Sequence, residues 1–156
     1  AAIAFELARA LRRSGKTLPS ALLVSGARAP RFRLGHVPPP EPSEEDFLKE
    51  LERLEGLPSE VREHPELLRV VLPALRADTA LYRAYVYTED SPLEMPVFTY
   101  GGRSDPNIRQ EHLEAWAEET KSDFRLRWFE GGHFFIDTAR EDFLAALAED
   151  LRGVLS

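Results

Sequence analysis

The chain has 156 residues, the length of a single domain, and 43% of them are hydrophobic, which is enough to bury a core. Its formal net charge of −7 argues against non-specific nucleic-acid binding, because such binding needs a basic surface. The absence of cysteine excludes a disulfide frame, a thiolate nucleophile and a cysteine-ligated zinc site.

Residues 1–14 have the pattern of an amphipathic helix, in which Ile3, Leu7 and Leu11 recur at helical spacing on one face. The pattern starts at Ala1 with no cap and no initiator methionine, so we expect that a preceding segment is missing. There is no signal peptide and no apolar run near the ~20 residues that span a membrane. We therefore expect no membrane partner and a cytoplasmic location.

The next segments predict a strand and then a loop. Residues 21–25 are a continuous apolar run, typical of a parallel strand covered on both faces. Residues 27–42 change character, because arginines alternate with alanine and phenylalanine before a run of prolines, and this predicts a connection. The arginines of this loop are either solvated or a patch for a phosphate or an acidic partner; they are Arg28, Arg31 and Arg33.

Residues 43–87 read as helical and contain no strand-like run. Ser43 has the spacing of a helix cap, Pro65 can open a further helix, and Pro73 should kink or split it. Short amphipathic helices interrupted by prolines, between two strands, are typical of a lid. The alternative is a helical subdomain that only fills space. We interpret His64, in this segment, as a surface residue and not as a ligand.

Two further strand-like runs each precede a helical pattern; the runs are residues 96–100 and 124–129, and the helical patterns are residues 108–120 and 137–152. His112, on the first of these helices, is interpreted as a solvated histidine. There is no internal repeat and no phosphate-binding glycine loop. His133 and Asp137 are spaced as two ligands on a helix, but two ligands are too few to predict a metal site.

These two strand-like runs end alike, in paired glycines followed by one titratable residue. Asp105 comes after Gly101-Gly102, and His133 comes after Gly131-Gly132. Paired glycines permit a sharp turn with positive φ, and they leave the next side chain at the carboxyl edge of the sheet, where open α/β sheets carry their sites. Either motif alone is ordinary turn chemistry. Together, acid before histidine, they predict the orienting acid and the general base of a nucleophilic triad, within hydrogen-bond reach of each other.

Five motifs in order carry a resemblance to a known family. They are Ala-x-x-Ala-Phe-Glu-x-Ala from Ala1, Leu-Val-Ser-Gly-Ala-Arg-Ala-Pro from Leu23, Leu-Pro-Ala-Leu-Arg-Ala-Asp from Leu72, Gly-Gly before Asp105-Pro106, and Phe-Arg-Leu from Phe124 with Gly-Gly-His-Phe-Phe from Gly131. Over essentially all 156 residues the sequence resembles the type II thioesterases, the stand-alone editing thioesterases of polyketide and non-ribosomal peptide (antibiotic) biosynthesis. The resemblance implies the C-terminal part of an α/β-hydrolase, a mostly parallel sheet flanked by helices. It implies one partial α/β domain over residues 1–156, with a helical lid insertion over residues 38–87.

In that family, a Gly-His-Ser-x-Gly nucleophile elbow directly precedes the stretch that matches Ala1 to Phe5. The resemblance therefore implies that the nucleophilic serine and the oxyanion donors lie upstream, so the 156 residues alone are expected to be inactive. Asp105 and His133 match the family's acid and base, whereas Ser25 and Ser104 stand in no elbow.

The implied reaction is hydrolysis of an acyl group, often an aberrant one, from the phosphopantetheine arm of an acyl or peptidyl carrier protein, with no bound cofactor or metal. The lid would shape the acyl pocket, for which the candidates are Phe47, Leu51, Leu68, Leu72 and Tyr82. The basic candidates for docking an acidic carrier are the three loop arginines named above. Two alternatives remain open: another α/β-hydrolase activity, such as an esterase or peptidase, and a non-catalytic truncated hydrolase that only binds a carrier or a partner half.

Overall fold

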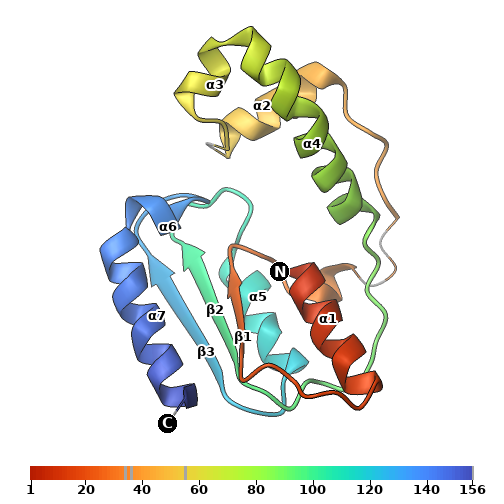
Figure 1. The fold of residues 1–156 in the computed structure, drawn as a ribbon, viewed down its shortest axis with the longest axis vertical. Helices are drawn as coiled ribbons and strands as arrows, with labels where there is room; N and C mark the ends of the chain where they lie inside the picture. Colours follow the sequence, from red (N-terminus) through yellow and green to blue (C-terminus); the bar gives the residue numbers. More distant parts are fainter. Residues whose placement is uncertain (34, 36, 55, 156) are drawn as a thin grey trace. The chain divides into compact units, whose positions relative to one another are not determined.

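The computed structural model describes residues 1–33, 35, 37–54 and 56–155 (Figure 1). The chain divides into two compact units. The first, here called the sheet unit, comprises Ala1–Phe32 and Glu89–Ser156, and the second, the helical unit, comprises Arg33–Thr88. The helical unit is thus one continuous insertion between the first and second strands of the sheet.

Among the described residues, three parallel strands form the sheet, in the order β1-β2-β3. Their bounds are Leu22–Ser25 for β1, Val97–Gly102 for β2 and Phe124–Phe129 for β3. Leu22 pairs with Val97, and Val97 pairs with Phe124, so the strands begin level with one another. Because they run in parallel, the residues that follow each strand emerge at the same edge of the sheet.

Helices outside the helical unit flank the sheet (Figure 1). They are α1 (Ala2–Arg13), α5 (Gln110–Glu114), α6 (Phe135–Thr138) and α7 (Arg140–Leu155), with 3-10 turns η1 (Pro30–Arg33) and η2 (Ala115–Glu119). The loop predicted over residues 27–42 thus contains η1, and the helix predicted over residues 108–120 is a short α-helix that tightens into η2. Among the described residues, no helix is both long and apolar enough to cross a bilayer.

An aromatic cluster fills one face of the sheet beneath α6 and α7. Side chains alternate along a strand, so Phe98 and Tyr100 of β2 point to the same face, where Phe129 of β3 joins them. Phe135 of α6 stacks on Phe129 with ring centroids 5.4 Å apart, and Phe143 of α7 meets Tyr100 edge-on at 5.5 Å. This buried cluster holds α6, and with it the loop just before α6, against the end of β3.

A buried carboxylate joins α7 to the same face. Asp150 is 1% exposed and accepts hydrogen bonds from the Tyr100 hydroxyl at 2.9 Å and from Arg127 Nη2 at 2.7 Å, with Arg125 as a third donor. Burial by itself raises the pKa of Asp150, but these hydrogen bonds outweigh it and hold the pKa below its ordinary value. The carboxylate is therefore ionised at neutral pH and fully engaged. The apolar periodicity that predicts a helix over residues 137–152 does not reveal it.

The opposite face of the sheet is covered by α5 and η2, with α1 packed beside them. Trp116 of η2 is buried and meets Phe5 of α1 edge-on, with ring centroids 5.5 Å apart. The buried residues of α1 are Phe5, Ala8 and Arg9. The stripe that the sequence pattern selects is a different one, since Ile3 and Leu7 are 74% and 56% exposed. Helical spacing finds apolar stripes, but it does not say which stripe another segment covers.

The predicted strand at residues 21–25 and its parallel pairing are confirmed, but the prediction that both of its faces are buried is not. Leu22 and Val24 are buried, whereas Leu23 and Ser25, on the other face, are only partly covered. Within the part of the chain that the structure describes, β1 pairs with β2 alone and is an edge strand. An edge strand has neighbouring side chains on one side only, so β1 is covered less than the central strand β2, whose residues are all buried.

The described part of the helical unit has three helices: α2 (Glu44–Arg53), α3 (Ser59–Glu63) and α4 (Pro65–Ala84). As predicted, Ser43 caps α2, since its hydroxyl oxygen accepts the N–H of Asp46 at 3.1 Å, and Pro65 opens α4. Pro73 does not split α4, which runs through it. A proline removes one hydrogen bond, and a helix of 20 residues has many others to maintain it.

Candidate active site

The loops that follow β2 and β3 are tied to each other. The backbone N–H groups of Arg103 and Ser104 donate to the carbonyls of Phe129 and Gly131, each at 2.9 Å, so the pairing of the two strands continues past their ends. Asp105 is the next residue after Ser104, and the loop after β3 leads from Gly131 to His133. The two side chains are thereby delivered to one edge of the sheet.

Asp105 and His133 face each other across this edge. His133 Nδ1 lies 2.6 Å from Asp105 Oδ2, so the predicted contact is confirmed. The Asp105 side chain is fully buried, whereas 30% of the His133 side chain is exposed. Because an ionised carboxylate can only accept, the contact assigns the imidazole proton to Nδ1 and leaves a lone pair on Nε2. The histidine is therefore oriented by a buried acid while it stays partly open to solvent.

The Asp105 carboxylate is engaged through both oxygens. Its Oδ1 accepts the N–H of Asn107 at 2.8 Å, which is the turn in which an aspartate bonds its own backbone two residues on. The N–H of Asp105 donates to Gly102 O at 3.2 Å. The carboxylate cannot rotate without losing either the bond to Asn107 or the bond to His133.

The glycines before the pair differ in what they do. Gly131 has φ +117° and so supplies the positive φ that the motif predicts. Gly101 and Gly102 do not adopt positive φ; they are the last residues of β2, so the sharp turn expected at these two positions is wrong. A Cβ at Gly102 would fall on the carbonyl oxygen of Gly132, so glycine is needed there for the close approach of two backbones.

The end of β1 brings a third segment to the same edge. Gly26 follows β1 with φ +56°, and its N–H donates to Tyr100 O at 2.9 Å. The His133 ring lies over Gly26, since a Cβ there would be 3.3 Å from His133 Cε1. Each of the three strands thus contributes a residue to one site beyond its carboxyl end.

Two residues outside the predicted site support the turn after β2. Arg28 donates from Nε and Nη2 to the carbonyl oxygen of Asn107, at 3.2 and 3.0 Å. His112 is 3% exposed, its Nδ1 accepts the N–H of Arg109 at 3.1 Å, and burial, with the nearby Arg28 and Arg109 charges, lowers its pKa. The interpretation of His112 as solvated is wrong, because α5 turns its ring inward against Phe32, 4.9 Å away. Its spacing of four residues from the apolar Trp116, one helical turn, was the available signal.

The other arginines proposed for docking have separate partners. Arg31 forms an ion pair with Glu118 of η2. The guanidinium of Arg33 lies 4.4 Å from the centre of the Tyr82 ring. Arg28, Arg31 and Arg33 therefore each contact a different group and do not form a single unpaired basic patch. Their role in docking a carrier protein stays a prediction.

The Asp105–His133 pair has the geometry of a general base and the acid that orients it. Among the described residues, no hydroxyl is hydrogen-bonded to His133, and no group of three potential metal ligands is present. Such a pair can take a proton from a hydroxyl or a water molecule and return it to a leaving group. Acyl transfer by this route also needs the nucleophile itself.

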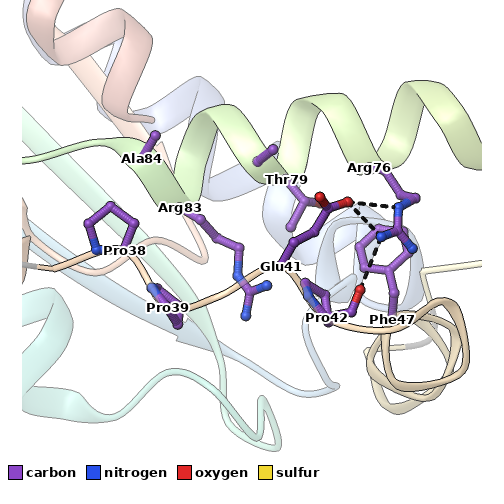
Figure 2. A pocket seen from close by; sticks show the side chains of 10 residues that line it. Pro38, Pro39, Glu41, Pro42, Phe47, Arg76, Thr79, Arg83 and Ala84 are labelled. Carbon is purple, nitrogen blue, oxygen red and sulfur yellow. Dashed lines mark hydrogen bonds and ion pairs between the residues drawn. The ribbon is translucent and has the colours of Figure 1, made fainter.

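The helical unit contains a small pocket of its own (Figure 2). A cavity of about 130 Å³ lies between α4 and the proline-rich segment before α2, with an apolar lining from Pro38, Pro39, Pro42, Phe47, Ala80 and Ala84. At one end Arg76 donates to Glu41 Oε1 at 2.6 Å and to Pro42 O at 3.0 Å. Arg83 also lines the cavity, and its buried Nη1 has no hydrogen-bond partner among the described residues.

The predicted acyl-pocket residues do not gather around this cavity. Phe47 lines it, and Leu72 is buried like Phe47. Leu51 and Leu68 are half-buried, and Tyr82 is 42% exposed. Their role in binding an acyl chain stays a prediction.

Comparison with known proteins places these features in a family. Residues 1–153 match the model of the thioesterase domain. The gramicidin S biosynthesis protein GrsT of Aneurinibacillus migulanus is 36% identical over 160 residues, which cover 100% of this chain and 61% of GrsT. The type II thioesterase BorB from the borrelidin biosynthetic cluster is 34% identical, with a TM-score of 0.79 over 95% of this chain and 60% of BorB. RedJ, a thioesterase from the prodiginine biosynthetic pathway in Streptomyces coelicolor, is 32% identical, with a TM-score of 0.81 over 92% of this chain and 57% of RedJ.

The solved structures on which the chain superposes, together with its own parallel sheet and flanking helices, define it as a protein of the α/β-hydrolase fold. Within that fold the chain belongs to the thioesterase family. Both the fold class and the family expected from the sequence are thereby confirmed. The chain spans about 60% of the length of these relatives.

Proposed function

We propose that the protein containing these residues hydrolyses acyl thioesters on the phosphopantetheine arm of an acyl or peptidyl carrier protein, as an editing thioesterase of a polyketide or non-ribosomal peptide assembly line. The observation that carries the proposal is the 2.6 Å contact between His133 and Asp105, in a chain of the thioesterase family. The names of the relatives support the type of pathway, since GrsT is named for gramicidin S biosynthesis and BorB for the borrelidin cluster.

His133 is the proposed general base. Its Nε2 takes the proton of a nucleophilic hydroxyl as that oxygen attacks the thioester carbonyl; the carbon–sulfur bond then breaks, and the proton passes to the departing sulfur. A water molecule, deprotonated in the same way, attacks the acyl-enzyme and releases the free acid. Asp105 keeps the imidazole in the required tautomer and stabilises the imidazolium in both steps.

The proposed nucleophile is a serine outside residues 1–156. The base and its orienter are both within the chain, but no described hydroxyl is hydrogen-bonded to His133. The same outside segments would have to supply the N–H donors that stabilise the oxyanion. In this proposal, the groups that take part in the reaction are protein side chains, backbone N–H groups and water.

The helical unit is proposed to act as a lid that contacts the acyl chain. Two observations support this role: it forms a compact unit of its own, and Phe47 lines its cavity. Replacing Phe47 by leucine should change the ratio of kcat/KM for long over short acyl chains by roughly 10-fold or more, since an apolar pocket discriminates a single methylene group by roughly 10- to 200-fold. Measuring hydrolysis along a series of acyl-chain lengths tests this.

The test of the catalytic proposal is thiol release by the full-length protein from an acyl-loaded carrier protein and from a short acyl-thioester mimic. His133→Ala should lower kcat by roughly 1,000-fold or more, and Asp105→Asn by a similar or smaller factor, because a triad acts as a unit. His64→Ala, a change at an exposed histidine of the helical unit, is the control and should have no effect. Residues 1–156 alone should release no thiol.

The outcomes separate the alternatives. Full activity of His133→Ala would overturn the assignment of the base. Preference for an oxygen ester or a peptide over the matched thioester would favour another α/β-hydrolase activity. Carrier binding without turnover by the full-length protein would favour the non-catalytic binding role.

A further inference from the structure

The proposed catalytic acid is held by a chain of hydrogen bonds that starts outside the Asp105–His133 pair. Asp105 Oδ2 contacts His133 Nδ1 at 2.6 Å, and Asp105 Oδ1 accepts the N–H of Asn107 at 2.8 Å. The carbonyl oxygen of the same Asn107 accepts two hydrogen bonds from Arg28, at 3.2 Å from Nε and 3.0 Å from Nη2. The guanidinium is thus connected to the carboxylate through the backbone of a single residue.

Arg28 reaches this turn from another strand end. It lies two residues beyond Gly26, over which the His133 ring sits, whereas Asn107 belongs to the turn after β2. Two donors from one planar guanidinium fix a carbonyl oxygen in position better than the single point charge of an ammonium group does. Arg28 is exposed, and among the described residues both of its recorded hydrogen bonds go to this one oxygen.

We propose that Arg28 is a positioning residue for the Asp105–His133 pair. It anchors the Asn107 carbonyl and so keeps residues 105–107 in the conformation in which both oxygens of Asp105 are engaged. Arg28 acts through Asn107 and Asp105 and does not touch the substrate. The kinetic test of this inference rests on the proposed function. The spectroscopic test rests only on the hydrogen bond between His133 Nδ1 and Asp105 Oδ2.

The size of the expected effect follows from what else holds the turn. His112 accepts the N–H of Arg109 at 3.1 Å, and the N–H of Asn107 donates to Asp105 Oδ1 at 2.8 Å. These contacts persist when Arg28 is removed. The turn should therefore loosen without unfolding, and the loss of rate should be smaller than the loss on removing Asp105 or His133.

The kinetic experiment uses the full-length protein and a short acyl-thioester mimic, so that carrier docking plays no part. Arg28→Ala should lower kcat by roughly 10- to 100-fold with little change in KM, since a misplacement of about 1 Å can cost that much. Arg28→Lys keeps a donor but not the fork, and should lose less. Arg152→Ala is the matched control: this exposed arginine also donates to a backbone carbonyl, Ala148 O at 3.1 Å, but within α7, and its kcat should be unchanged.

A double-variant comparison separates positioning from substrate contact. In the Asp105→Asn background, Arg28→Ala should lower kcat by less than about twofold further, because a residue that acts through Asp105 has nothing left to position. An undiminished further loss would overturn the proposal. So would a raised KM with kcat intact, which would assign Arg28 to direct substrate binding.

The spectroscopic readout does not depend on turnover. The Nδ1 proton of His133, identified by its loss in His133→Ala, should give a downfield proton resonance that moves upfield or broadens in Arg28→Ala but not in Arg152→Ala. An unchanged resonance in Arg28→Ala would overturn the proposal even in an active thioesterase. A moved resonance in a protein that hydrolyses no thioester would support the positioning role while the proposed function fails.

Discussion

The sheet unit and the helical unit bury very different amounts of apolar surface. In the sheet unit the aromatic cluster covers one face of the sheet, Trp116 packs against the other, and Asp150 adds a buried polar anchor. In the described part of the helical unit, the buried apolar residues are Phe47, Leu72 and Tyr87. Large apolar side chains of α4 are exposed instead; Leu67, Val70 and Leu81 are 45%, 76% and 63% accessible.

This difference separates a part that must be rigid from a part that need not be. Buried apolar area is the main favourable term in folding, so the segment that buries less should open at a lower free energy. A base and its orienter work only at fixed geometry, whereas a surface that meets acyl chains of several lengths gains from being adjustable. Under the proposed function, the stability of each unit matches its task.

The largest expected effect is at the close backbone contact between Gly102 and Gly132, beside the Asp105–His133 pair. Gly102→Ala should cost more than about 3 kcal/mol of stability, the upper end for overpacking, because the new methyl group would meet the Gly132 carbonyl oxygen. Activity should fall roughly 100-fold or more as the loop carrying His133 is displaced. Gly132→Ala is the control, since a Cβ there has no atom within 4 Å. If Gly102→Ala and Gly132→Ala had equal denaturation midpoints and equal rates of hydrolysis, the close backbone contact at Gly102 would not constrain the sheet unit as expected.

The next effect tests the helical unit. Phe47→Ala removes a side chain that is 3% exposed and should cost about 3 kcal/mol, within the range for buried phenylalanine. Because the helical unit is a separate compact unit with few buried apolar side chains, the destabilisation should stay within it. Hydrogen exchange should quicken in α2 and α4, whereas exchange in β1 and β2 should not change. In the wild type, α2 to α4 should already exchange faster than the strands. Equal protection in both units would contradict the comparison.

A third variant tests the polar anchor of the sheet unit. Asp150→Asn should destabilise the protein by about 2 kcal/mol at neutral pH, the scale of hydrogen bonds to a charged group. The pKa of Asp150 is lowered in the fold from its ordinary 3.8, so its contribution is complete above that value and is lost as pH falls through the lowered pKa. Urea denaturation should therefore show a gap between wild type and variant at pH 7 that shrinks near pH 3. Asp78→Asn, a change at an exposed aspartate of α4, is the control and should change stability little at either pH. If the difference in stability between wild type and Asp150→Asn persisted undiminished in acid, ionised Asp150 would not be the stabilising group.

The smallest effect is expected in the pocket of the helical unit. Arg83→Met removes a buried donor that has no hydrogen-bond partner among the described residues, and it should leave stability unchanged or raise it by up to about 1 kcal/mol. Arg76→Met, in the same pocket, should destabilise the helical unit because Glu41 and Pro42 lose their donor. Hydrogen exchange of α4 measures both variants. A larger loss for Arg83→Met than for Arg76→Met would show that the Arg83 guanidinium has a partner in solution.

Local patterns in the sequence were enough to predict the strands, the insertion of helices between β1 and β2, and the pair Asp105 and His133. Apolar runs bounded by glycine or proline act over a few residues, and parallel strands place the residues that follow them at one edge whatever packs around the sheet. Chain order alone therefore brought the acid and the histidine together. The thioesterase family was likewise readable from motifs in order.

The tertiary structure decided what depends on a segment that is distant in sequence. Which stripe of α1 is covered depends on where Trp116 arrives, and the burial of Asp150 depends on Tyr100, which is 50 residues away. The reason for glycine at position 102 is the backbone of the neighbouring loop. Arg28 and Asn107 are 79 residues apart, so no local periodicity could have joined the guanidinium to the turn that holds the acid. Such contacts form only after the strands have paired, since it is the pairing that sets which side chains come within reach of one another.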